Sequence, residues 1–143
     1  MNKIKPILSK IVNIICIVII VYVIISFVFC KTYTIESGSM TPKLSIGCLV
    51  TIVPDKLPEV NDIAAFSTEP VKYRGVGFIR IPQTSGIITI HRVISIDADG
   101  NYLFKGDAAD ASAIQKIPAE RIVGKELWHN NLLAPLIRLV RHI

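Results

Sequence analysis

The sequence is poor in the residues that crosslink small proteins or bind metals. It has three cysteines, three histidines and one tryptophan among 143 residues. Cys16 and Cys30 fall within an apolar run, and Cys48 stands alone after it, so a disulfide within the remaining chain is excluded. No cysteine or histidine pair has the close spacing of a metal site. We therefore expect neither a metal nor a cofactor.

Charge is absent from residues 11–30, whose sequence is IVNIICIVIIVYVIISFVFC. Twenty helical residues span about 30 Å, the thickness of the apolar core of a bilayer. The run has no polar face, which excludes an ordinary amphipathic surface helix. A small-x-small pattern does not follow it, which argues against a cleaved signal peptide. The sequence therefore predicts one transmembrane helix over residues 11–30.

Basic residues indicate the direction of this helix. Lys3, Lys5 and Lys10 precede it, whereas Lys31 alone follows closely. The positive-inside rule places such a basic flank in the cytoplasm. We expect residues 1–10 to be cytoplasmic, and the protein to be a single-pass protein of the plasma membrane with an extracytoplasmic domain.

A surplus of either charge is missing from that domain. Residues 31–130 contain 11 Lys and Arg against 11 Asp and Glu, so the net charge of +5 resides at the two ends of the chain. This distribution favours contact with membrane lipid and argues against a nucleic-acid partner. The oligomeric state is not indicated by any pattern.

Residues 31–130 also lack any long helical pattern. They contain short runs rich in β-branched residues, separated by turn signals such as Asp99-Gly100. About 100 residues of this kind predict a mainly β, small barrel-like domain of short antiparallel strands. The expected strands cover residues 44–53, 62–66, 77–82, 86–96, 101–105 and 121–128.

The tail, residues 131–143, has a different pattern. Its apolar residues recur at helical spacing with basic residues between or after them, which predicts a short amphipathic helix. The segment is too short and too charged to span a bilayer. It either packs on the domain or lies at the membrane interface, and the sequence leaves both open.

The stretch ESGSMTP, residues 36–42, is the first candidate for chemistry. A serine hydroxyl becomes a useful nucleophile when a base takes its proton and nearby hydrogen-bond donors stabilise the oxyanion that forms. Ser39 is the candidate nucleophile, and its N–H together with the Ser37 hydroxyl could bind one oxygen. Gly38 would permit a sharp turn beside Ser39. The alternative is an ordinary polar turn leading into a strand.

The base and its support must come from elsewhere in the chain. His142 is terminal and His129 follows the last expected strand, whereas His91 lies in the middle of the longest one. Asp107 follows the next strand, which the Asp99-Gly100 hairpin joins to the strand of His91. An acid is thus expected near the histidine, although His91 could be a packing residue and Asp107 part of a plain turn.

SGSMTP, IHRVI and KGDA, in this order after one N-terminal anchor, resemble signal peptidase I over roughly residues 10–128. VNDIAAF at 60–66 and RIVGKELW at 121–128 resemble further segments of that family. Histidine at position 91, where many bacterial members have lysine, resembles the branch found in the endoplasmic reticulum, archaea and sporulating bacteria. The resemblance implies a membrane-bound serine endopeptidase that cuts signal peptides from exported preproteins after small-x-small sites.

The resemblance also implies roles for single residues. Ser39 would be the nucleophile, His91 the general base and Asp107 the acid that orients or stabilises the base. The N–H of Ser39 and the hydroxyl of Ser37 would form the oxyanion hole.

One position departs from the family pattern. Histidine-type members usually carry a second acid six residues after the Asp107 position, where this chain has Ala113. Asp110 is the only nearby acid and is included as a candidate catalytic residue. The departure motivates an alternative function, a catalytically impaired, membrane-anchored binding module derived from a signal peptidase.

Overall fold

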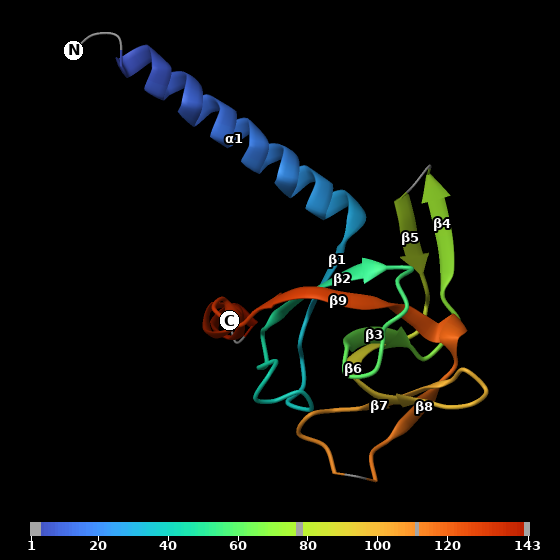
Figure 1. Ribbon diagram of the computed structural model, residues 1–143. Coiled ribbons are helices and arrows are strands. Elements are labelled where there is room, and N and C mark those ends of the chain that lie inside the picture. Colours follow the sequence, from blue (N-terminus) through green and yellow to red (C-terminus); the bar gives the residue numbers. More distant parts are fainter. Residues whose placement is uncertain (1–3, 77–78, 111, 142–143) are drawn as a thin grey trace.

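The computed structural model describes residues 4–76, 79–110 and 112–141. Helix α1 (Ile4–Phe29) projects from a β-rich domain, and the short helix α2 (Ala134–Arg141) follows that domain (Figure 1). The strands of the domain are β1 (Lys31–Thr34), β2 (Leu49–Pro54), β3 (Ile63–Ser67), β4 (Lys72–Val76), β5 (Ile79–Gln83), β6 (Ile88–Ile96), β7 (Tyr102–Lys105), β8 (Gln115–Ile117) and β9 (Ile122–Asn130).

Seven of these strands form one antiparallel sheet in the order β1-β2-β9-β3-β6-β7-β8, and β4 and β5 form a separate ribbon. The expectation of a mainly β domain of short antiparallel strands is thereby confirmed. The expected barrel-like closure is wrong. Within the described residues, β1 and β8 each pair with one neighbour, so the sheet keeps two open edges.

The core lies on both faces of this sheet, with β3 between its two halves. All five residues of β3 are buried, and alternation sends them to opposite sides. Ile63 and Ala65 pack into one cluster, whereas Ala64 and Phe66 pack into the other. The first cluster holds the segment before β2, and the second supports β6, β7 and β8. The two clusters thus fix the position of the segment before β2 and of the strands from β6 to β8.

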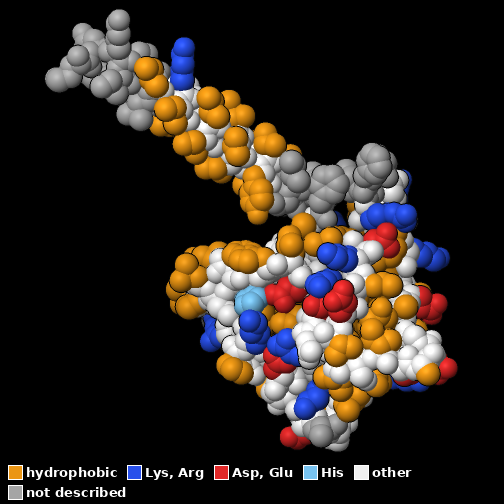
Figure 2. Space-filling view, viewed as in Figure 1, with side chains coloured by type: hydrophobic (Ala, Val, Ile, Leu, Met, Phe, Trp, Pro, Cys, Tyr) orange, Lys and Arg blue, Asp and Glu red, His pale blue; other side chains and the backbone are white. Residues whose placement is uncertain are grey.

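Helix α1 contains the charge-free run except for its last residue. Its described side chains from residue 9 to residue 24 are exposed, and Figure 2 shows them as a mostly hydrophobic rod. In the described part of the chain, no helix combines the length and apolarity needed to cross a membrane. The transmembrane helix predicted over residues 11–30 therefore stays a prediction, and the side chains of residues 25–29 lie outside the described part.

The tail does form a helix, α2, which lies against the segment before β2. The Arg138 side chain donates through Nε to the carbonyl of Ile46, and the Asn131 side chain accepts from the N–H and the hydroxyl of Ser45. Ala134 is buried at the start of the helix. Several α2 side chains remain exposed, so the helix is attached at its beginning and along one side. Residues 142 and 143 of the predicted tail lie outside the described residues.

Candidate active site

Ser39 lies in the loop between β1 and β2, and the loop is held by its neighbours. Met40 is only 1% exposed and Leu44 is fully buried in the first core cluster. The N–H and hydroxyl of Thr41 both donate to the carbonyl of Gly38, which closes a turn around Ser39. Ser39 itself stays half-buried at the surface. Burial of Met40 therefore fixes the backbone beside a serine that remains accessible.

The role expected for Gly38 is wrong. Its φ lies outside the left-handed region that favours glycine, and an added Cβ would meet the Thr41 hydroxyl at 3.4 Å, an ordinary contact. The turn is made by hydrogen bonds to the Gly38 carbonyl, which any residue could supply. Its conformation therefore does not require glycine.

The turn after β7 forms the platform on which Ser39 rests. The Ala108 N–H donates to the Ser39 carbonyl at 2.9 Å. A Cβ at Gly106 would lie 2.5 Å from the same carbonyl oxygen, closer than real Cβ atoms come. Gly106 is thus required because the Ser39 backbone lies directly against it. The KGDA segment therefore positions Ser39, the predicted nucleophile, and this role of the segment was not expected from the sequence.

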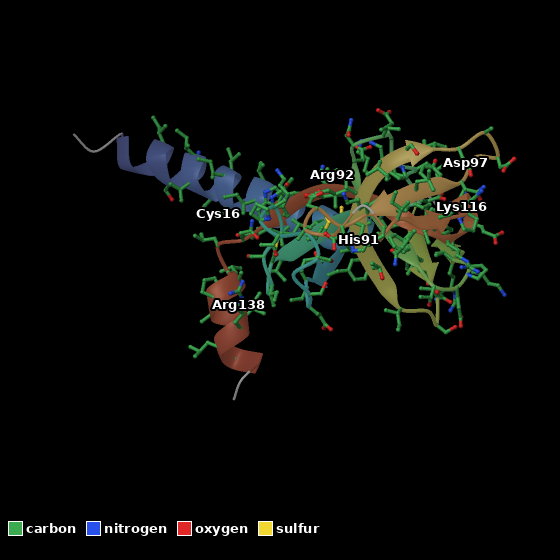
Figure 3. All side chains as sticks on the ribbon, turned by 90° about the horizontal axis from the view of Figure 1, so that it is seen from below. Cys16, His91, Arg92, Asp97, Lys116 and Arg138 are labelled. Atoms are coloured by element: carbon green, nitrogen blue, oxygen red, sulfur yellow. The ribbon has the colours of Figure 1, made fainter. Side chains whose placement is uncertain are left out.

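His91 reaches Ser39 from the middle of β6. Its Nε2 lies 3.0 Å from Ser39 Oγ, within hydrogen-bond distance. On β6 the residue pairs with Ala64 of β3, and its ring packs against Phe66 with the ring centroids 6.0 Å apart. Figure 3 labels His91 near the centre of the domain. The structure therefore brings together the predicted nucleophile and base, which are 52 residues apart in the chain.

The surroundings of His91 favour a neutral imidazole. Burial lowers the pKa of His91, because it removes water from the charged form. The Gln115 side chain, and to a smaller extent the charge of Asp107, act in the opposite direction. Nδ1 is buried and makes no hydrogen bond of normal geometry to any described residue. The ring is thus kept in its basic form, but its second nitrogen is poorly satisfied.

The structure does not place Asp107 as a hydrogen-bond partner of His91. Its carboxylate accepts two hydrogen bonds from the Arg92 guanidinium, at 2.8 and 2.6 Å. The pKa of Arg92 is raised by this hydrogen bonding to Asp107. Arg92 also donates to the Asn61 carbonyl at 2.9 Å. Asp107 thus fastens the end of β7 to β6 and acts on His91 through its charge alone.

The remaining predicted residues occupy different positions. Asp110 is exposed in the loop after β7. The Ser37 hydroxyl lies 3.1 Å from Ser39 Oγ, close enough to share a hydrogen bond with it. His129 binds Glu126 on its own strand, β9. His142 lies outside the described residues. Ser37 therefore joins the Ser39–His91 pair, whereas Asp110 does not contact it.

A groove of about 870 Å³ runs beside Ser37 and Ser39. One wall is formed by residues 32–36 and the other by residues 87–90 at the start of β6, with three apolar side chains of α2 completing it. Residues 88–91 pair with β3 on one side, whereas pairing with β7 begins at Arg92. Within the described residues, this part of β6 thus has an open edge.

Comparison with models of known protein families gives a match. Residues 8–100 match the family model described as signal peptidase, peptidase S26. No curated protein matches the chain. The matched segment is well over half of the chain and contains both Ser39 and His91.

Proposed function

Since the chain belongs to the signal peptidase family, peptidase S26, we propose that it is a membrane-bound serine endopeptidase that removes signal peptides from exported preproteins. The observation that carries the proposal is the 3.0 Å contact between Ser39 Oγ and His91 Nε2. A serine and a neutral imidazole at this distance form a nucleophile and its base. The same contact favours a peptidase over the alternative of an inactive binding module.

In the proposed reaction, Ser39 Oγ attacks the scissile carbonyl while its proton passes to Nε2 of His91. The resulting imidazolium then gives that proton to the departing amine, and an acyl-enzyme on Ser39 remains. A water molecule attacks this ester while its proton passes to His91, and the imidazolium then returns that proton to Ser39 Oγ as the acyl product leaves. Burial of the imidazole keeps the base unprotonated at neutral pH and ready for the first step.

The oxyanion would be stabilised by the Ser37 hydroxyl and the N–H of Ser39. The Ser37 hydroxyl lies 3.1 Å from Ser39 Oγ, so it is near the place where the carbonyl oxygen becomes negative. Loss of one such donor typically costs about 10²–10³ in turnover. Ser37 is therefore assigned to the oxyanion hole and not to proton transfer.

The groove beside Ser39 suits an extended peptide. Free backbone groups of residues 88–91 can pair with a substrate strand, as in strand addition to a sheet edge. Such a strand would run between residues 32–36 and β6 and pass Ser39. Cleavage after small-x-small sites, and membership of the histidine-type branch with His91 as base, follow from the family resemblance and belong to the proposal.

Attachment to the membrane is also part of the proposal. Residues 11–30 are uncharged, and three lysines precede them while one follows closely. This pattern supports an anchor in the plasma membrane with a cytoplasmic N-terminus and an extracytoplasmic domain. Ser39 follows residue 30 by nine positions, so it could lie at most about 30 Å from the membrane surface. A preprotein still held in the bilayer by its signal peptide would then meet the site at high effective concentration.

The direct test is cleavage of a preprotein with a small-x-small site by the purified full chain in detergent. We expect cleavage by the wild type and by Ser112→Ala, whose exposed serine lies outside the site, and none by Ser39→Ala. Mass spectrometry of the products would give the cleaved bond. Equal cleavage by Ser39→Ala, with contaminating peptidase excluded, would show that the proposed nucleophile is wrong.

A further inference from the structure

The proposed role of His91 as a base requires a hydrogen-bond acceptor for its second ring nitrogen, Nδ1. If Nε2 accepts the proton of Ser39, the neutral ring must carry its own proton on Nδ1. Nδ1 is buried, and a buried donor without a partner destabilises that tautomer relative to the one protonated on Nε2. A tautomer with its proton on Nε2 cannot act as base toward Ser39. Some group must therefore accept a hydrogen bond from Nδ1 when the enzyme works.

None of the nearby candidate residues accepts a hydrogen bond from Nδ1 in the described part of the chain. Asp107 accepts hydrogen bonds from Nε and Nη2 of Arg92, and Asp110 is exposed in its loop. Ala113 stands where the sequence pattern leads one to expect an acid, and its side chain has no polar atom. Phe66, which packs against the ring, offers none either.

Gln115 lies on the same face of the sheet as His91. It is the first residue of β8 and pairs with Phe104 of β7, which in turn pairs with Val93 of β6. Directly opposed residues in neighbouring antiparallel strands project to the same face, and so do residues two apart on one strand. His91, Val93, Phe104 and Gln115 therefore share one face.

Gly106 marks the level of His91 at the end of the neighbouring strand β7. Gly106 is the residue after Lys105, which pairs with Arg92, so Gly106 follows β7 at the level of His91. On this face the Ser39 backbone fills the space where a Gly106 side chain would lie, so Gly106, Ser39 and His91 lie together there. The Gln115 side chain also acts on the pKa of His91 as a hydrogen-bond partner does, raising it against the effect of burial.

We propose that Gln115 is the positioning residue of the base: its side-chain Oε1 accepts the hydrogen bond from Nδ1–H of His91. This inference rests on the proposed function of the Ser39–His91 pair. Gln115 does not touch the substrate. It selects the tautomer in which Nε2 is free, and it holds the ring toward Ser39. It thereby provides in this chain the support that Ala113 cannot.

The proton balance is simple. The proton of Ser39 Oγ moves to Nε2 and later to the leaving amine, while the Nδ1 proton stays on the ring and remains hydrogen-bonded to Oε1. A neutral amide stabilises the imidazolium less than a carboxylate would. Asp107 supplies the nearby negative charge, and Arg92 largely offsets it. β3, the Ser39 loop and β8 present no charged side chain to the ring in the described contacts.

Two substitutions of Gln115 separate a positioning role from a structural one. In Gln115→Leu we expect kcat for preprotein cleavage to fall roughly 10- to 100-fold with KM little changed, which is at or below the lower end of the 10²–10⁴ that a general base contributes. In Gln115→Glu the carboxylate accepts the same hydrogen bond and adds a charge. We expect this variant to retain activity, with the acid limb of its pH profile moved up by roughly one pH unit or more. Gln83→Leu and Gln83→Glu, on the distant β5, are matched controls that should behave as the wild type.

A second readout does not depend on activity. In the folded Ser39→Ala chain in detergent, NMR titration of the His91 ring should give a higher pKa with Gln115→Glu than without it, and Gln83→Glu should change nothing. An unchanged His91 pKa in the Gln115→Glu background, or wild-type kcat in Gln115→Leu, would overturn the proposal. If Ser39→Ala still cleaves preprotein, the proposed function fails, yet the titration still decides whether Gln115 contacts His91.

Discussion

The imidazole of His91 is partly buried between Phe66 and Ser39, and this burial determines where the base titrates. Removal of water disfavours the charged ring and lowers the pKa of His91 below its ordinary value of about 6.5. Gln115 and Asp107 reduce that effect without being its main cause. The neutral form, which the proposed mechanism requires, therefore persists to lower pH than in an exposed histidine.

The pH dependence of cleavage should show this shift. Activity requires neutral His91, so kcat/KM should rise with pH through the pKa of the free enzyme, with its midpoint below about 6.5. The measurement is kcat/KM for a preprotein between pH 4.5 and 9, on enzyme shown to stay folded by circular dichroism. A midpoint well above 6.5, or a flat profile, would contradict a buried histidine base.

The sequence was sufficient to predict some residues of the site and insufficient for others. Ser39 and His91 could be chosen because the chain has few histidines and one of them lies in its best strand. Asp107 was expected beside His91 from the hairpin alone, but alternation puts Arg92 on the other face, and a guanidinium binds a carboxylate more strongly than a neutral ring does. Gln115 could not be found, because β8 is short and polar, and its pairing with β7 cannot be read from spacing.

At the level of secondary-structure elements, the site depends on how the Ser39 loop rests on the turn after β7. Gly106 and Ala108 both contact the Ser39 carbonyl, one by close packing and the other by a hydrogen bond. The turn thus fixes the position of Ser39 relative to the sheet. The Arg92–Asp107 ion pair ties the same turn to β6, so Ser39 and His91 are held by one connected unit.

Substitution of Gly106 should therefore impair catalysis, although glycine carries no reactive side chain. In Gly106→Ala, the added Cβ must displace the Ser39 backbone, and a shift of about 1 Å can cost about 10²-fold in rate. Overpacking should also lower the free energy of unfolding by about 1–3 kcal/mol. Kinetic assays with urea unfolding would measure both.

The comparison variant is Gly38→Ala, which places the same methyl group on the other side of Ser39. The Cβ there meets its nearest neighbour at an ordinary 3.4 Å, so we expect a much smaller loss of activity. Equal losses in Gly38→Ala and Gly106→Ala would show that the close contact with Gly106 is not what positions Ser39.

Strands were predictable where β-branched runs are long and bounded by turns. The expected strands at 86–96 and 101–105 agree with β6 and β7 to within two residues. The strand expected from residue 44 begins at Leu49, because hydrogen-bonded turns and the positive φ of Gly47 occupy the residues before it. β1, β4 and β8 were missed, since they are short and carry charged or polar residues whose pairing depends on distant partners.

For the molecule as a whole, both helices lie at one end of the β-domain. Figures 1 and 3 show α1 and α2 on the same side, and Figure 3 shows Asp97 and Lys116 at the opposite end. Side chains of α2 also line the groove that leads to Ser39. If α1 anchors the chain, the groove would thus open near the membrane, where a signal peptide is delivered.

Charge placed in α1 should therefore release the protein from the membrane. Arginine costs about 2.5–3.5 kcal/mol at the centre of a membrane helix, so Val18→Arg combined with Val21→Arg should move the chain from the membrane fraction to the soluble fraction. Leu127→Arg replaces a similarly exposed apolar residue in β9 and serves as the control. Immunoblots of carbonate-washed fractions measure the distribution. Retention of the double variant in the membrane, equal to the control, would contradict anchoring by α1.

The global arrangement was only partly accessible from the sequence. The uneven placement of charge suggested an anchor and its direction, because those depend on composition. Closure of the sheet did not follow, because it depends on whether the edges β1 and β8 meet, which local patterns do not encode. The docking of α2 depends on hydrogen bonds that join Arg138 and Asn131 to residues about 90 positions earlier in the chain.

The central claim is that Ser39 and His91 act as one catalytic unit, and a double-mutant cycle on kcat tests it most directly. Residues that share one step are strongly non-additive, so Ser39→Ala, His91→Ala and the double variant should all lose about the same activity. Preprotein cleavage by the three folded variants and the wild type is the measurement. A double variant whose loss equals the product of the two single losses would show that the residues act independently and would contradict the account.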